Sequence, residues 1–338
     1  MTPSMFSTRE RAGRASDVLR VLSASAMLAA LSAGVVHAQE RPAAAKDDNL
    51  YEHVMKARKA AGTDLMHHFY HRCFVDPNYT GTIAKLRKEA APMEPLKVFD
   101  QLYFLGQNGV SSWALQTSQG IIIFDTLNNP DEARQYIEGG MAKLGLDPKQ
   151  IRYVFIMHEH ADHFGGAKYL QEKYPGLHLA ASAIAWQNMP TANRGAGLMP
   201  RHDIDVADGQ KFTLGDTTLT FYSTPGHSDG TISTIFKVTD HGAPHVVGFF
   251  GGMGSPNTAA NRTKIIASFK RWRPLAAAAG VDTLIANHQG QDYSVENLEF
   301  LKVRHPTDPN PYVLGKDAYQ RYFEVQTECT YANLVRHE

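Results

Sequence analysis

The sequence predicts an α/β fold in which short buried strands alternate with helices and carry polar loops at their ends. Apolar, β-branched runs of strand length recur along the 338-residue chain, and residues 151–157 form the clearest of them. Residues 167–174 have a helical pattern that stops at the helix-breaking pair Pro175-Gly176. Loops that follow such strands are rigidly supported, so functional residues are expected there first.

Residues 1–38 have the features of a secretion signal. A basic lead precedes an apolar stretch at residues 21–36, and Val36-His37-Ala38 resembles a small-x-small cleavage site. The apolar stretch is shorter than the roughly 20 residues that span a membrane. We therefore expect cleavage after Ala38, a periplasmic or secreted mature protein and no stable membrane anchor; an uncleaved anchor is the alternative.

Helical segments are predicted on both sides of the strand-rich part of the chain. Residues 39–95 comprise an Ala/Pro/charged linker up to residue 49 and a mostly helical N-terminal extension. A Pro-rich connection leads to a final helix at about residues 316–335, within a C-terminal extension of residues 303–338. These helices could cover a hydrophobic face or mediate a homodimer.

The only two cysteines, Cys73 and Cys329, fall one in each extension. Export would place them in an oxidising compartment, where a disulfide can persist. We predict a bridge that ties the N-terminal extension to the C-terminal helix. Two separate buried thiols are the alternative.

The remaining strands are predicted within residues 96–302. The chain order is three strands at 99–105, 112–117 and 120–124, a helix at 131–144, the strand at 151–157, and later strands at 217–222, 245–255 and 284–286.

The run His158-Glu159-His160-Ala161-Asp162-His163 is the most informative part of the sequence, because three imidazoles and a carboxylate follow a buried strand directly. Neutral imidazole nitrogen and carboxylate oxygen are ordinary zinc ligands. The spacing lets His158 and His160 face one metal ion while Asp162 and His163 face a second. Glu159 is then either a partner of an imidazole N–H or a solvated loop carboxylate.

Two downstream histidines repeat this context of strand, loop and histidine. His227 follows the predicted strand at 217–222, and His288 follows the apolar run at 284–286. Each would be weak evidence alone, but together they supply the further ligands that a two-metal site needs.

These residues resemble the motifs of the metallo-β-lactamase-fold hydrolases, over a match from about residue 96 to about residue 301. The resemblance implies a four-layer αββα sandwich as the catalytic domain and two Zn²⁺ ions per chain. It assigns His158, His160 and His227 to the first zinc, and Asp162, His163 and His288 to the second.

One departure from the superfamily pattern reduces the number of subgroups that the chain resembles. Most members have an Asp that bridges both metals at the end of the strand predicted here at 245–255, but no Asp occurs between Asp240 and Asp282. Glyoxalase II enzymes, lactonases and persulfide dioxygenases rely on that residue. The third subclass of metallo-β-lactamases lacks it, and this stretch also lacks the Cys ligand of the first two subclasses. Hydrolytic dehalogenases of chlorinated aromatics share the fold and stay possible.

The expected activity is zinc-dependent hydrolysis, with opening of the β-lactam amide as the favoured reaction. Zinc lowers the pKa of bound water to about 7, so hydroxide is available at neutral pH. Asp162 would orient the metal-bound hydroxide as well as bind zinc. A zinc hydrolase of an ester, lactone or aryl halide, a non-catalytic metal-binding protein and an iron oxygenase are the alternatives.

Substrate contacts are expected from loops near the metals. The residues proposed for them are Trp113, Asn128, Arg194, Ser255 and Asn261. Residues 188–200 are turn-rich and apolar and could form a lid over the site.

Charge composition gives no indication of a polyanionic partner. Basic and acidic side chains balance at 34 each, so no basic excess points to nucleic acid. A small-molecule substrate is the expected partner.

Overall fold

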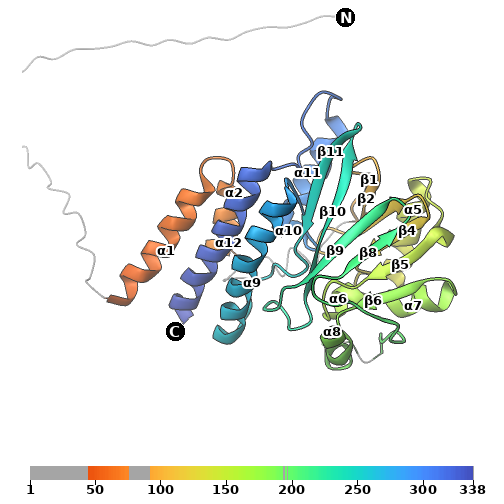
Figure 1. The fold of residues 1–338 in the computed structure, drawn as a ribbon, viewed down its shortest axis with the longest axis horizontal. Coiled ribbons are helices and arrows are strands. Elements are labelled where there is room, and N and C mark those ends of the chain that lie inside the picture. Colours follow the sequence, from red (N-terminus) through yellow and green to blue (C-terminus); the bar gives the residue numbers. More distant parts are fainter. Residues whose placement is uncertain (1–44, 76–91, 193–194, 196, 338) are drawn as a thin grey trace, which may run out of the picture. The chain divides into compact units, whose positions relative to one another are not determined.

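The computed structural model describes residues 45–75, 92–192, 195 and 197–337 (Figure 1). The predicted signal peptide at residues 1–38 lies outside these residues. None of the described helices is long and apolar enough to cross a membrane.

Two β-sheets form the centre of the molecule (Figure 1). The seven-stranded sheet has the order β1-β2-β3-β4-β5-β6-β7, with strands Leu96–Lys97, Leu102–Gly106, Ser111–Thr117, Gly120–Phe124, Ile151–Phe155, His178–Ala181 and Ile204–Asp205. The five-stranded sheet has the order β12-β11-β10-β9-β8, and in chain order its strands are β8 Lys211–Leu214, β9 Thr217–Ser223, β10 Ile232–Asp240, β11 Ala243–Phe249 and β12 Thr283–Ile285. Strands β4 to β7 are parallel, and so is the pair β11 and β12.

Alternating side chains build the core on both faces of the first sheet. In β4, Ile122 and Phe124 point toward the second sheet, where they join Phe221 and Phe236 in one buried cluster. Ile121 and Ile123 belong to the cluster on the opposite face, which contains apolar side chains of the covering helices. Those helical segments are α4 Pro130–Glu132, η3 Ala133–Glu138, α5 Gly139–Lys143, α6 Ala161–Phe164, α7 Ala167–Lys173 and α8 Ala183–Asn188.

Long helices cover the outer face of the second sheet and complete the four layers. Helix α9, Ala259–Ala279, packs against this sheet through a third buried cluster that includes Phe250 and Trp272. The C-terminal helix α12, Lys316–His337, lies beside α9, and the N-terminal helix α1, Ala45–Ala61, lies along α12 (Figure 1). The predicted αββα sandwich with helical terminal parts is confirmed.

The predicted bridge between the two extensions is present. Cys73 lies in η1, His71–Val75, which follows the short helix α2, Met66–Tyr70, and it forms a disulfide with Cys329 of α12. Both sulfur-bearing residues are fully buried. The N-terminal extension is therefore fixed covalently to the helix layer.

Some element boundaries differ from those predicted. The strand expected at 99–105 is β2, Leu102–Gly106, because a turn closed by the hydrogen bond from Leu102 N to Phe99 O precedes it. The helix expected at 131–144 contains the π-helical segment η3 between α4 and α5. The remaining short elements are η4 Pro148–Gln150, η5 Met189–Thr191, α10 Gln289–Asp292 and α11 Ser294–Val303.

Candidate metal centre

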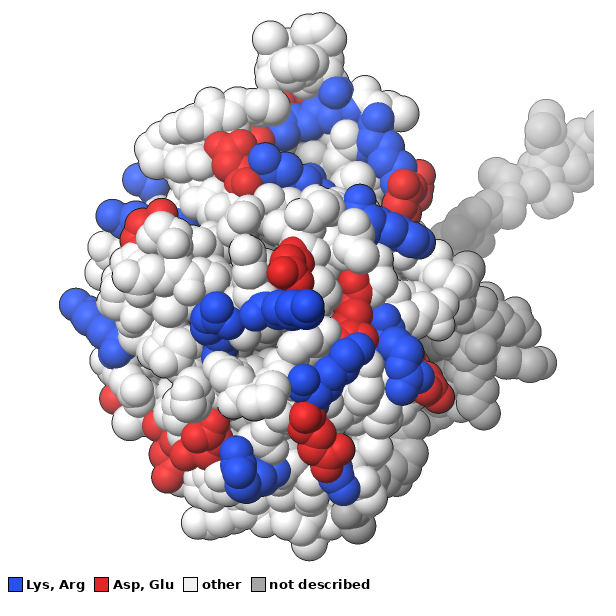
Figure 2. Space-filling model, turned by 90° about the vertical axis from the view of Figure 1, so that its right-hand side faces the viewer, with Lys and Arg blue, Asp and Glu red and all other residues white. Residues whose placement is uncertain are grey.

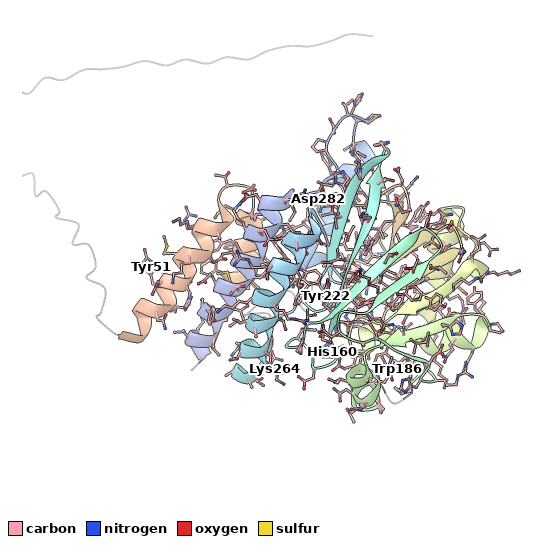
Figure 3. All side chains as sticks on the ribbon, in the orientation of Figure 1. Tyr51, His160, Trp186, Tyr222, Lys264 and Asp282 are labelled. Atoms are coloured by element: carbon pink, nitrogen blue, oxygen red, sulfur yellow. A yellow bond between two sulfur atoms is a disulfide. The ribbon has the colours of Figure 1, made fainter. Side chains whose placement is uncertain are left out.

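The loop after β5 presents four ligand-type side chains at one end of the sandwich. His158 and His160 lie in the bend between β5 and α6, whereas Asp162 and His163 lie on the single turn of α6. His160 serves as the N-terminal flanking residue of that turn, with φ −74° and ψ 144°. In Figure 3 His160 lies between α8 and the N-terminal part of α9.

The first group of ligands consists of His158, His160 and His227, and one potential ligand atom from each lies within 4.8 Å of the others. The three ring centroids form a nearly equilateral triangle, with separations of 4.8, 4.7 and 4.7 Å. His227 reaches this position from the turn after β9, in the second sheet. The two sheets therefore both contribute to the group.

The second group consists of Asp162, His163 and His288, and it meets the same 4.8 Å criterion. The Nε2 atoms of His163 and His288 are 3.1 Å apart, and Asp162 Oδ2 lies 3.4 Å and 3.7 Å from them. Ligands about 2.1 Å from a tetrahedral zinc ion lie about 3.4 Å from each other. The spacing of these atoms therefore suits one zinc ion.

Four of these histidines have Nδ1 engaged with a fixed acceptor. The pairs are His158 with Gly251 O at 2.8 Å, His163 with Asp125 Oδ2 at 2.8 Å, His227 with Gly254 O at 3.1 Å, and His288 with Gly109 O at 2.8 Å. A proton on Nδ1 leaves the Nε2 lone pair available to a metal. The buried Nε2 of His158 has no hydrogen-bond partner in the described structure, as expected of a metal ligand.

The electrostatics of the two groups suit a metal in different ways. Burial and neighbouring imidazoles hold the pKa of His158 well below its usual value and lower that of His227 to about 3, so both rings stay neutral. Burial alone would raise the pKa of Asp162, but His163 and His288 hold it well below the usual range. Burial would lower the pKa of His163, but Asp162 and Asp125 raise it to about 10, so zinc must displace a proton from this ring to bind. His158, His227 and the ionised Asp162 are already in the forms that bind zinc.

Asp125 supports the second ligand group, and the sequence does not reveal this contact. It follows β4, has a φ of 60° and is fully buried. Its Oδ1 accepts a hydrogen bond from Met157 N at 2.8 Å, and its Oδ2 accepts one from His163. The only sequence signal is a polar Asp-Thr pair at a strand end, which is common in loops.

The end of β11 contains no carboxylate near the two groups. Residues 251–254 pass directly beside His227, and a Cβ at Gly252 or Gly254 would come within 2.9 or 2.7 Å of that side chain. A side chain at either position would therefore displace His227. In place of a carboxylate, this segment offers the backbone carbonyl of Gly254, which contacts Nδ1 of His227.

The residues predicted to contact substrate fall in different environments. Asn128 lines a cavity of about 330 Å³ beside the second group, together with Glu132, Asp162 and His288. Ser255 is partly buried directly after Gly254, and Asn261 lies in the first turn of α9, where its backbone N–H bonds to Thr258.

Trp113 and the proposed lid lie differently from the expected arrangement. Trp113 is fully buried and donates from Nε1 to Ala286 O at 2.8 Å, so it supports the segment that carries His288 and has no surface to offer a substrate. Arg194 lies outside the described residues. Met189, at the start of the predicted lid, is fully buried in the core beneath the first sheet.

Comparisons with known proteins agree with the fold and the ligand pattern. Residues 105–240 match the family model for the metallo-beta-lactamase superfamily. BJP-1, a subclass B3 metallo-beta-lactamase of Bradyrhizobium japonicum, has a similar structure, with a TM-score of 0.59 and 28% identity over 70% of this chain and 92% of that chain. Residues 105–240 thus match a metallo-β-lactamase superfamily domain, a domain type found in metal-dependent hydrolases.

Curated relatives match over a shorter region. A hydroxyacylglutathione hydrolase of Gloeobacter violaceus is 31% identical over 37% of this chain and 44% of its own length. An atrochrysone carboxyl ACP thioesterase of Claviceps purpurea is 28% identical over 38% of each chain. The chain thus spans less than half the length of these relatives.

Proposed function

We propose that the protein is a zinc-dependent hydrolase that opens the amide bond of β-lactams. The observation that carries the proposal is the pair of adjacent ligand groups, one of three histidines and one of Asp162, His163 and His288, without a carboxylate from the end of β11. The same ligand pattern is implied by the resemblance to the third β-lactamase subclass. The similarity to BJP-1 along nearly all of its length supports this choice of substrate.

Two zinc ions, when bound, would supply Lewis acidity and a hydroxide nucleophile at neutral pH. The chain's own contribution is to fix the ligand atoms before substrate arrives. Nδ1 contacts hold His163 and His288 with Nε2 toward the second position, and Asp162 lies beside both. We assign Asp162 a second role in orienting the attacking water. Hydrolysis then needs no covalent enzyme intermediate, so isolation of a stable acyl-enzyme would contradict this route.

Thioester hydrolysis is the second candidate function. The names of the curated relatives, a hydroxyacylglutathione hydrolase and an acyl-carrier-protein thioesterase, favour it. The glycine-lined end of β11 argues against it, because glyoxalase II enzymes depend on an Asp at that place.

The same proposal includes export to the periplasm or the medium. The basic and apolar character of residues 1–38 and the disulfide between Cys73 and Cys329 support it. The N-terminal sequence of the mature protein from its native host tests it: cleavage after Ala38 is expected, and a retained Met1 would contradict it.

The decisive experiment is hydrolysis of a panel of penicillins, cephalosporins and carbapenems by the zinc-loaded mature protein. A chelated sample and a His163→Ala variant serve as controls, and S-lactoylglutathione tests the thioester reaction. Turnover of β-lactams that both controls abolish is expected. Turnover of the thioester alone would replace the β-lactam assignment with the second candidate.

A further inference from the structure

Glu159 lies between two ligands of the first group, yet its carboxylate contacts no imidazole in the described structure. The side chain is 5% exposed, so it is not a solvated loop carboxylate either. Its Oε2 accepts a hydrogen bond from Ser228 Oγ at 2.6 Å, and its Oε1 accepts one from Gly230 N at 3.1 Å. Oε1 also accepts a bond from Asn188 Nδ2, at 3.1 Å.

The three donors come from two segments that are distant in sequence. Ser228 and Gly230 belong to the turn between β9 and β10 that carries His227, and Asn188 is the last residue of α8. A single buried carboxylate therefore joins the loop of His158 and His160 to the turn of His227 and to the helix before the predicted lid.

Hydrogen bonds within the turn that carries His227 tie its residues to one another. Ser228 Oγ lies 2.9 Å from Thr231 Oγ1, and Gly226 N donates to Ser228 O. Gly230 also sits tightly against α8, because a Cβ there would lie 2.5 Å from Ala185 N and 2.6 Å from Glu159 Oε2. Movement of the carboxylate would thus disturb the backbone that directly follows His227.

The second ligand group has separate supports. His163 is held by Asp125, and His288 by Gly109 O, and neither contact involves Glu159 or its partners. Asn287 Nδ2 does connect supports of the two groups, because it lies 3.4 Å from Asp125 Oδ2 and 2.6 Å from Gly251 O. A change at Glu159 leaves all of these contacts in place.

We propose that Glu159 is a positioning residue for the first metal: its three hydrogen bonds hold His227 in register with His158 and His160 and couple that register to the end of α8. The inference rests on the proposed metal centre. Residues that orient ligands in this way change metal affinity by about 10- to 100-fold when they are removed.

Zinc affinity of each group, measured alone, tests the proposal. In a His288→Ala background only the first group is complete, and in a His160→Ala background only the second is. Zinc is titrated into the metal-free full chain in competition with a chelator of known affinity. Glu159→Ala should weaken binding by about 10- to 100-fold in the first background and leave it within about threefold in the second.

Three further variants test whether the hydrogen bonds of Glu159 are what changes the zinc affinity of the first group. Ser228→Ala removes one hydrogen bond and should weaken the first group in the same direction. Glu159→Gln keeps an acceptor for Gly230 and Asn188, so it should retain most of the affinity. Asp229→Asn, in the same turn but exposed and paired with Lys264, is the matched control and should change nothing.

The possible failures are distinguishable. Absence of zinc binding by the unmodified chain would overturn the metal centre and this inference together. Normal zinc binding that Glu159→Ala leaves unchanged, or weakens equally in both backgrounds, would overturn only the role of Glu159. Should Glu159→Ala fail to fold, Ser228→Ala and Glu159→Gln carry the same comparison, with the melting temperature of the metal-free protein as the check on folding.

Discussion

The hydrogen bond between His163 and Asp125 determines which ring nitrogen of that histidine can face a metal. Asp125 is buried and acts as an acceptor toward Nδ1, so Nε2 is directed at His288 and Asp162. Burial raises the pKa of Asp125, but the pair with His163 offsets part of that effect. The geometry of the candidate second zinc position therefore depends on a residue that is not one of its ligands.

Replacement of this carboxylate by an amide tests the dependence. Asp125→Asn keeps the volume but presents a donor or a weaker acceptor to His163, so zinc affinity and hydrolysis should fall by about 10- to 100-fold. Bound zinc per chain after dialysis and the hydrolysis rate at saturating zinc measure both effects. Asp131→Asn, an exposed carboxylate on α4, is the control. Full zinc retention in Asp125→Asn would show that His163 is oriented without it.

For single residues, the sequence identifies the candidate metal ligands better than it identifies the groups that orient them. His158, His160 and the downstream histidines are recognisable, because their residue types are themselves the chemistry. Asp125 and the backbone carbonyls of Gly109 and Gly254 are not, because their role exists only once distant strands meet. Trp113 shows the converse, since an aromatic residue near the site in sequence turns out to be core.

Between elements, Glu138 connects the covering helices of the first sheet. It accepts hydrogen bonds from Tyr169 and Lys173 of α7 and from Tyr174, which follows that helix. Burial would raise the pKa of Glu138, but these partners outweigh it and lower the pKa. The carboxylate therefore stabilises the fold above its unfolded pKa, near 4.5, and this stabilisation is lost as pH falls through the folded value.

Glu138→Gln should accordingly cost roughly 1–2 kcal/mol at pH 7, since Lys173 is partly solvated and its pair is screened. The difference from the unmodified protein should narrow as the pH falls below about 4.5. Urea unfolding at a series of pH values measures it, with Glu172→Gln on the exposed side of α7 as the control. If the difference in unfolding free energy did not change with pH, the loss would come from packing and not from the charge of Glu138.

The disulfide joins the two extensions at a point that also bears on the site. Next to Cys73, the buried Arg72 donates to Met253 O at 2.6 Å and to Thr330 Oγ1 at 2.9 Å, directly beside the Gly254 carbonyl that orients His227.

Removing a native disulfide commonly costs about 2–5 kcal/mol. Paired Cys73→Ser and Cys329→Ser substitutions should lower unfolding stability by that amount. A reductant should do the same to the unmodified protein and nothing to the variant; equal stability of both proteins would contradict the prediction.

The arrangement of elements is only partly predictable from the sequence. The strand before the ligand loop and the C-terminal helix are found near their predicted positions, because each has a local signal. Helix α9 has cap signals at Thr258 and Gly280, but Pro274 inside it interrupts the helical pattern of the sequence. Packing of Phe269 and Trp272 against the second sheet supports the helix through that position.

In the whole molecule, the candidate metal centre lies where the two sheets meet. Each ligand group combines residues after β5 of the first sheet with one residue from the second, His227 after β9 or His288 after β12. On the face of the molecule that Figure 2 shows, basic and acidic side chains are interspersed. Because each ligand group takes residues from both sheets, metal ions bound there would cross-link the two layers.

Metal removal should destabilise the whole fold for this reason. A ligand at 100 times its dissociation constant stabilises the folded state by about 2.7 kcal/mol, and for a domain of this size that corresponds to a melting-temperature shift of roughly 5–10 °C. Calorimetric scans with excess zinc, and after chelation, measure the shift. A His160→Ala/His163→Ala variant is expected to melt at one temperature in both conditions, because each group has lost a ligand. If the unmodified protein bound zinc tightly but melted unchanged, the unfolded chain would have to bind it equally well, and the centre would not link the sheets energetically.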